Sequence, residues 1–190
     1  HVLNALRALN NRCVAIFITS DKCYENVEWL WGYKETDRLG GKDPYSASKA
    51  AAEMAIKSYV DSYFPSEENG FIRIATARAG NVIGGGDWSQ GRIIPDCIQS
   101  WIRNELACIR NPHSTRPWQH VLEPLFGYLK LAAFVDADIS LHGQSFNFGP
   151  KVNQVYSVGD LVNRLVNIWG GDSSYSIVSN NGQKFESNLL

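Results

Sequence analysis

The chain has 190 residues, of which 44% are hydrophobic and 19% charged, a balance that excludes disordered, collagen-like and coiled-coil proteins. With 18 Lys and Arg against 19 Asp and Glu, the chain lacks the positive field of a nucleic-acid-binding protein. Its longest apolar stretches, such as Cys13–Ile18, are too short to cross a bilayer, and the N-terminus does not resemble a signal peptide. We therefore expect a soluble protein with no nucleic acid or membrane partner.

The four cysteines and four histidines show no metal-binding pattern. No two cysteines form a CxxC pair, and the histidines have neither HxxxH nor HExxH spacing. We expect no metal site, reduced thiols and a cytoplasmic location.

The first half of the chain alternates helix and strand patterns, which indicates an α/β fold with a parallel sheet. The connection after its first strand is unusually long, and loops of that length are commonly functional. The predicted elements are a helix over 2–9, a strand over 13–19, a connection over 20–43, a helix over 45–64, a strand over 71–78, a glycine-rich turn over 80–87 and a helix over about 93–103.

The second half has a different pattern, with shorter strands. It indicates a smaller lobe at the edge of the sheet. The predicted elements are strands near 106–109 and 118–121, a helix near 123–135, a strand near 145–148 and a helix near 158–169.

Tyr45 and Lys49 are four residues apart on the helix predicted over 45–64. This spacing places both side chains on one helix face, about 5–6 Å apart at Cβ. A lysine ammonium at that distance favours the phenolate form, which lets tyrosine act as a base. The spacing alone also fits two exposed helix residues, so the pair needs further context.

That context is the tripeptide Ser20-Asp21-Lys22, which follows the first predicted strand. Ligands in open α/β sheets bind at the carboxyl ends of the strands. A hydroxyl, a carboxyl and an amine there can hold a sugar hydroxyl, donate a proton and accept one. Taken alone, the tripeptide also fits a helix cap or a turn.

Five motifs follow one another along the chain: TSDKCYEN (19–26), YSASK (45–49), RAGNVIGGGDW (78–88), GRIIPD (91–96) and TRPWQHVLEPL (115–125). In this order they resemble the extended short-chain dehydrogenase/reductase superfamily, and within it the nucleotide-sugar 4,6-dehydratases. The resemblance covers nearly the whole chain. Lys22, where the relatives acting on dTDP-glucose usually have Glu, favours the branch acting on CDP-sugars, as does RPWQHVLEP.

The resemblance implies the C-terminal part of a Rossmann-like, doubly wound parallel sheet with a smaller substrate-binding lobe. Residues 1–104 would form a partial NAD-binding domain that carries the catalytic motifs. Residues 105–190 would form mainly the nucleotide-sugar lobe, interleaved with the first and truncated. NAD is the implied cofactor, CDP-glucose or a similar nucleotide sugar is the implied substrate, and the product would serve the synthesis of deoxysugars for surface polysaccharide such as the lipopolysaccharide O-antigen.

The resemblance also assigns catalytic roles. Tyr45, supported by Lys49 and Ser20, would deprotonate the sugar O4 while C4 gives hydride to NAD. Lys22 would remove the C5 proton, and Asp21 would protonate the departing 6-hydroxyl before hydride returns to C6. An amine acts as a base only when neutral, which requires desolvation or a cationic neighbour.

Binding residues follow from the same motifs. Arg92 and Arg116 would approach the nucleotide diphosphate, with a surface salt bridge as the alternative for each. Asn81 and Asn147 would contact the sugar diphosphate, although asparagine beside glycine also forms ordinary turns. Trp88, Trp118 and the aromatic segment 29–33 could face the base or fill a core or lid. The expected cofactor-binding residues are Thr19, Tyr45, Lys49, Arg78, Gly80 and Val82, of which the last three could equally be structural.

The sequence departs from the family in one respect: no GxGxxG or GxxGxxG motif for the cofactor pyrophosphate is present. We therefore expect a fragment of a longer enzyme, inactive alone, whose helix over 45–64 contributes to a homodimer. Two other hypotheses remain. One is a nucleotide-sugar epimerase or reductase; the other, if the chain is naturally complete, is a non-catalytic nucleotide-sugar-binding module.

Overall fold

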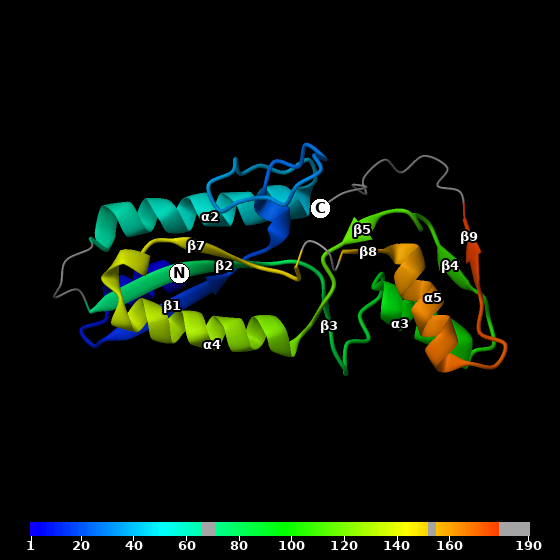
Figure 1. The fold of residues 1–190 in the computed structure, drawn as a ribbon. Helices are drawn as coiled ribbons and strands as arrows, with labels where there is room; N and C mark the ends of the chain where they lie inside the picture. Colours follow the sequence, from blue (N-terminus) through cyan, green and yellow to red (C-terminus); the bar gives the residue numbers. More distant parts are fainter. Residues whose placement is uncertain (66–70, 152–154, 179–190) are drawn as a thin grey trace.

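The larger lobe is built around a parallel β-sheet (Figure 1). The computed structural model describes residues 1–65, 71–151 and 155–178. Strand β2 (Ile72–Ala79) lies between β1 (Cys13–Ile18) and β7 (Ser145–Phe148), and both pairs run parallel. The predicted α/β class with a parallel sheet is confirmed.

Helices cover both faces of this sheet, with α2 and α4 on opposite sides (Figure 1). Side chains alternate along β2. Ile74 therefore packs with Ile56 of α2, whereas Ala75 packs with Val135 of α4. Each face has its own apolar core. The helices of this lobe are α1 (Val2–Arg7), α2 (Pro44–Tyr63), the short 3-10 helix η2 (Ile139–Leu141) and α4 (Leu122–Ala137).

The smaller lobe has a separate core, in which Cys97 and Trp101 pack with Ile109 and Val162. Its strands form two short pairs, β4 with β9 and β5 with β8. Its elements are α3 (Ile93–Ile102), β4 (Ala107–Ile109), β5 (Thr115–Arg116), β8 (Tyr156–Ser157), α5 (Val158–Trp169) and β9 (Tyr175–Ile177).

The chain passes between the lobes more than once. β3 (Val82–Ile83) and β6 (Gln119–His120) form a parallel pair on these passages. Helix α3 precedes residue 104 and packs in the smaller lobe, whereas α4 and β7 follow it and complete the larger lobe. The two lobes thus exchange segments across the boundary predicted at 104.

The connection over 20–43 runs from β1 to α2. It begins with the 3-10 helix η1 (Asp21–Cys23), and a single bridge joins Tyr24 to Leu39. Gly41 lies against the first turn of α2, where a Cβ atom would be 2.2 Å from the backbone nitrogen of Ala47. Only glycine allows this close approach, which holds the end of the connection beside the start of the helix.

The long helices and the strands of the larger lobe lie where the sequence patterns predicted them. The strand predicted near 118–121 is shorter, because only Gln119–His120 pair and Val121 already caps α4. β3, β5, β8 and β9 were not predicted, because strands of two or three residues show no period. Among the described residues, none of the helices combines the length and apolarity needed to span a membrane.

Candidate active site

A cleft of about 750 Å³ lies at the carboxyl ends of β1 and β2 and extends to residues of the smaller lobe. Lys49, Arg78 and Asn147 do not line it. Of the aromatic candidates, Tyr33, Trp88 and Trp118 reach it, whereas Trp29 and Trp31 do not. The predicted site residues that line the cleft are Thr19, Ser20, Asp21, Lys22, Tyr45, Gly80, Asn81, Val82, Arg92 and Arg116.

The Ser20-Asp21-Lys22 segment forms the first turn of η1. The Ser20 hydroxyl caps this turn by accepting the Lys22 backbone N–H at 3.2 Å, and it donates to Asp21 Oδ1 at 3.0 Å. Asp21 Oδ2 is buried without a hydrogen-bond partner among the described residues. Burial raises the pKa of the Asp21 carboxyl, although Ser20 and Lys22 act in the opposite direction. Burial thus favours the protonated form of Asp21, which is the form that can donate a proton.

Tyr45 stands at the start of α2, which Asp43 caps. Asp43 Oδ1 accepts the backbone N–H groups of Tyr45 and Ser46, both at 3.0 Å. The Tyr45 side chain is about half exposed to the cleft (52%). The Nζ atoms of Lys49 and Lys22 lie 5.8 and 5.9 Å from its ring centre. Tyr45 thus lies near the amino groups of two lysines, and its phenolate form can take a proton from a bound hydroxyl.

A buried ion pair fixes α2 to the strand that ends at the cleft. Arg78 of β2 donates from Nε to Glu53 Oε1 at 3.0 Å and from Nη2 to Oε2 at 2.9 Å. Glu53 lies one turn beyond Lys49 on the same helix face. Burial alone would raise the pKa of the Glu53 carboxyl, but hydrogen bonds from Arg78 and Thr19 outweigh it and hold the pKa below its usual range.

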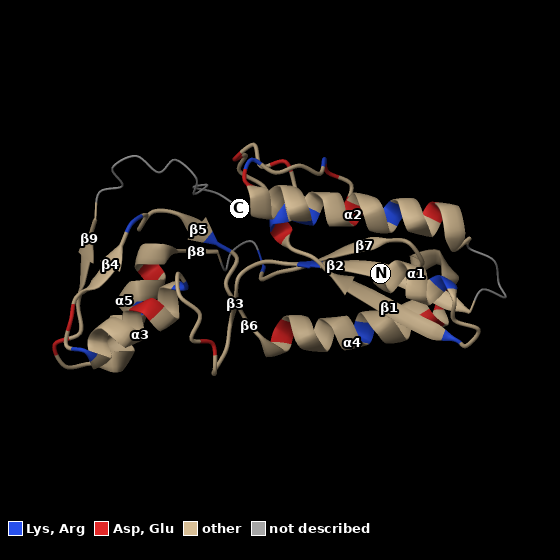
Figure 2. Cartoon of the chain, turned by 180° about the vertical axis from the view of Figure 1, so that it is seen from behind, with Lys and Arg blue, Asp and Glu red and all other residues tan. Residues whose placement is uncertain are grey.

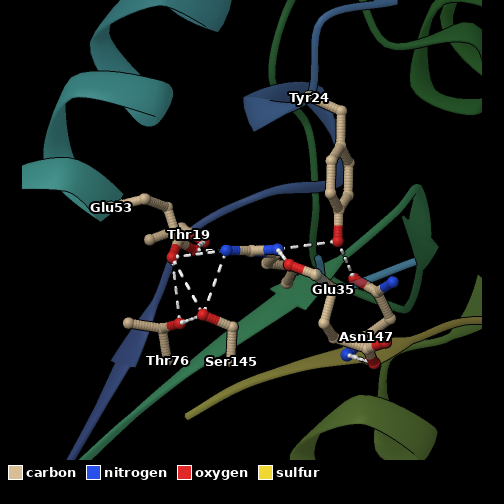
Figure 3. A network of polar contacts seen from close by, with 8 residues as sticks. Thr19, Tyr24, Glu35, Glu53, Thr76, Ser145 and Asn147 are labelled. Carbon is tan, nitrogen blue, oxygen red and sulfur yellow. Dashed lines mark hydrogen bonds and ion pairs between the residues drawn. The ribbon is translucent and has the colours of Figure 1, made fainter. Parts of the chain in front are cut away.

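The hydrogen bonds of this ion pair extend to the long connection over 20–43. In Figure 3, Glu53 and Tyr24 lie on opposite sides of the resulting network. Arg78 also donates to Tyr24 Oη at 2.8 Å and to the Glu35 carbonyl at 3.0 Å. The Tyr24 hydroxyl in turn donates to Asn147 Oδ1 at 2.7 Å. The side chains of Arg78 and Asn147 are therefore occupied in this network, and any contact of Arg78 with a ligand would come from its backbone.

Two predicted phosphate-binding arginines line the cleft. Arg116 is buried and donates to the Thr115 carbonyl at 2.7 Å. Figure 2 shows Lys and Arg positions in blue on the chain between the two lobes. The Arg92 side chain is more exposed, and its Nε atom lies 3.9 Å from Asp87 Oδ2. Two guanidinium groups that line one cleft suit a diphosphate.

Sequence reasoning missed Glu53 and Ser114. The signal for Glu53 was its spacing, four residues after Lys49 and eight after Tyr45. Ser114 lines the cleft and is almost fully buried, yet nothing in its local sequence marks it.

Comparison with known proteins agrees with this geometry. The model of the NAD dependent epimerase/dehydratase family matches residues 1–149. The chain belongs to this family. Within the family, the CDP-glucose 4,6-dehydratase of Salmonella typhimurium is 44% identical over 184 residues, which are 95% of this chain and 51% of that protein. The resemblance inferred from the motifs is confirmed.

Two solved structures of family relatives share the fold. A UDP-glucose 4-epimerase of Thermotoga maritima matches with a TM-score of 0.76 and 19% identity, over 99% of this chain and 56% of that chain. A dTDP-glucose 4,6-dehydratase of Streptomyces venezuelae, solved with NAD bound, matches with a TM-score of 0.74 and 18% identity, over 93% and 50%. The chain spans about half the length of each of these relatives and of the Salmonella protein.

Proposed function

We propose that this chain carries the active site of a CDP-glucose 4,6-dehydratase, which converts CDP-glucose to CDP-4-keto-6-deoxyglucose. The observation that carries the proposal is one cleft lined by a buried carboxyl with one unpaired oxygen and by a tyrosine whose ring centre lies 5.8 and 5.9 Å from two lysine Nζ atoms. An epimerase needs only the tyrosine and its lysine for proton transfer at O4. The elimination of water needs an additional acid and base, and Asp21 and Lys22 supply them.

The cleft fits the reacting end of NAD, the cofactor in the family's description. Gly80 brings bare backbone to the cleft, since a Cβ atom there would lie 3.0 Å from Asp21 Oδ2 and 2.5 Å from Pro117 Cγ. Thr19, Tyr45, Lys49, Gly80 and Val82 would hold the nicotinamide end. When bound, NAD would take up hydride from C4 of the sugar and return it at C6. The glycine motif for its pyrophosphate is not among these 190 residues.

The protein's own groups divide the proton transfers. Tyr45, hydrogen-bonded to the sugar O4, accepts its proton as C4 is oxidised, and the new 4-ketone makes the C5 proton acidic. Lys22 in its neutral form takes that proton. As the C5–C6 double bond forms and the C6–O bond breaks, Asp21 donates its proton and the hydroxyl leaves as water. Asp21 meets this demand because burial already favours its protonated form. Lys22 would give its proton back to C5 when hydride is returned at C6, and the proton held by Tyr45 would pass through solvent to Asp21.

Arg92, Arg116 and Asn81, which line the cleft, would hold the diphosphate of the substrate. Asn147 contributes indirectly, because its side-chain amide donates to the Tyr33 carbonyl at 2.9 Å and so supports the connection that lines the cleft. A homodimer and a cytoplasmic location complete the proposal, with surface-polysaccharide deoxysugar synthesis as its setting.

The test uses the purified full-length protein with NAD and CDP-glucose deuterated at C4. A dehydratase gives a product lighter by one water, with the deuterium at C6. An epimerase gives a product of unchanged mass, and a binding module gives no product although it binds CDP-glucose. Either of the last two results would overturn the proposal.

A further inference from the structure

Three buried polar side-chain atoms have no hydrogen-bond partner within the described part of the chain, namely Asp21 Oδ2, Ser114 Oγ and Trp118 Nε1. All three belong to residues that line the same cleft. Leaving a buried donor or acceptor unpaired costs folding free energy, so folded proteins rarely do so. Three such atoms in one cleft indicate that a bound molecule completes their hydrogen bonds.

Ser114 and Trp118 lie two residues before and two residues after Arg116, and all three residues line the cleft. Arg116 ends β5, and the Trp118 backbone N–H donates to the Arg116 carbonyl at 2.9 Å, so the chain turns tightly at Pro117. The two unpaired groups therefore flank the buried Arg116 within one short segment of the cleft wall.

We infer that Ser114 and Trp118 bind the nucleotide sugar directly, on either side of the diphosphate that Arg116 holds. The inference rests on the proposed function and adds two substrate-binding residues to it. An indole N–H only donates, so Trp118 pairs with an oxygen of the substrate. A hydroxyl can donate or accept, so Ser114 accommodates either kind of group.

The surroundings assign each residue to one end of the substrate. Pro117, next to Trp118, packs toward Gly80, which lies beside the Asp21 carboxyl. Trp118 is therefore on the side of the reacting sugar. The Ser114 carbonyl accepts the Val158 N–H of α5 at 2.9 Å, which places Ser114 at the smaller lobe. With Trp118 beside the reacting sugar and Arg116 at the diphosphate, the inference assigns Ser114 to the nucleoside end.

The test compares unpaired groups with paired ones of the same type. Trp118→Phe removes an indole N–H that lacks a protein partner, whereas Trp101→Phe removes one that donates to the Ser174 carbonyl at 2.8 Å. Ser114→Ala is matched by Ser140→Ala, because the Ser140 hydroxyl donates to Asp138 Oδ1 at 2.7 Å, far from the cleft. Binding is measured by calorimetry with NAD present, and stability by urea denaturation.

We expect Trp118→Phe and Ser114→Ala each to weaken CDP-glucose binding about 3- to 10-fold without lowering the urea midpoint. Trp101→Phe should lower the midpoint, Ser140→Ala should change it little because Ser140 is exposed, and neither control should change binding. With CDP as the probe, Ser114→Ala should keep its effect and Trp118→Phe should lose it. Unchanged CDP-glucose affinity in both cleft variants, or a lowered midpoint with unchanged affinity, would overturn the inference.

UDP-glucose and dTDP-glucose separate this inference from the proposed function. If the wild-type protein binds one of them and not CDP-glucose, the proposed substrate is wrong, and the same variants measured with the bound sugar still decide the roles of Ser114 and Trp118. Binding of none of the three sugars would overturn both proposals.

Discussion

Two polar regions lie side by side at the carboxyl ends of the strands, and they differ in how completely they are paired. The Arg78 guanidinium makes five hydrogen bonds, to Glu53 twice and to Tyr24, Glu35 and Ser145. An arginine has five N–H donors, so this group is fully satisfied. In the cleft, three buried polar atoms have no partner in the described chain.

The difference separates polar groups that hold the fold from polar groups that meet a ligand. Thr19 belongs to both regions, because its hydroxyl donates to Glu53 and its residue lines the cleft. The saturated network fixes α2, β1 and β2 relative to one another, which sets Tyr45 and Lys49 opposite Ser20 and Asp21. Changes in the network should therefore affect stability first, and changes in the cleft should affect binding and chemistry.

The largest effect on stability is expected from Glu53→Gln. The change leaves the Arg78 charge buried without its counter-charge, so the free energy of unfolding should fall by about 3–5 kcal/mol. Glu105→Gln is the matched control, because Arg103 and Glu105 form a pair with the same 2.9 Å separation but more than half exposed. The control should cost about 0–1 kcal/mol by urea denaturation. Equal losses in the two variants would contradict the role assigned to the network.

A smaller loss is expected from His142→Ala. The buried His142 accepts the Ile74 backbone N–H at Nδ1, at 3.0 Å, so its Nε2 carries the hydrogen that pairs with the Phe64 carbonyl at 2.8 Å. Removing the ring leaves both backbone groups unpaired and should cost about 1–3 kcal/mol. The exposed His120 accepts the Leu122 N–H, where water can replace it, so His120→Ala should change the urea midpoint little.

The smallest loss is expected from Asp43→Ala, which removes the cap of α2 and should cost about 1 kcal/mol. Hydrogen bonds from Ser46 hold the pKa of Asp43 below its usual range. The charged cap therefore stabilises the fold above the unfolded carboxyl pKa of about 3.9, and this contribution is lost as the pH falls through the lower folded value. Asp43→Asn should keep most of the stability and lose this acid dependence. Urea denaturation of both variants and the wild type at pH values from about 3 to 7 checks both expectations.

The parts of the molecule predicted from sequence are those that local patterns determine. Tyr45 and Lys49 share a helix face by spacing alone, and the segment after β1 had to lie at the carboxyl edge of the sheet. The alternation of side chains between the two faces of β2 also contained information that was not used. Arg78 is two and four residues after Thr76 and Ile74, so its side chain had to face α2 and Glu53.

Other features depend on partners far along the chain. Ser114 is buried because Val158, more than 40 residues later, pairs with its backbone and β8 pairs with the adjacent β5. Trp118 Nε1 is likewise buried without a partner in the described chain because of how distant parts of the chain pack around it. No local pattern predicts either, because neither periodicity nor capping specifies which distant side chains meet.

The most direct test of the account is Asp21→Asn, measured for both stability and dehydration. Burial raises the pKa of Asp21, so its charged form destabilises the fold once the pH exceeds the unfolded value of about 3.9. At pH 7 the neutral Asn variant should therefore unfold at higher urea than the wild type, and the difference should vanish in acid. The rate at which the variant eliminates water from CDP-glucose should be lower than the wild-type rate by about 100-fold or more, because the acid is missing. A variant that is less stable at pH 7, or that dehydrates the sugar at the wild-type rate, would contradict the account.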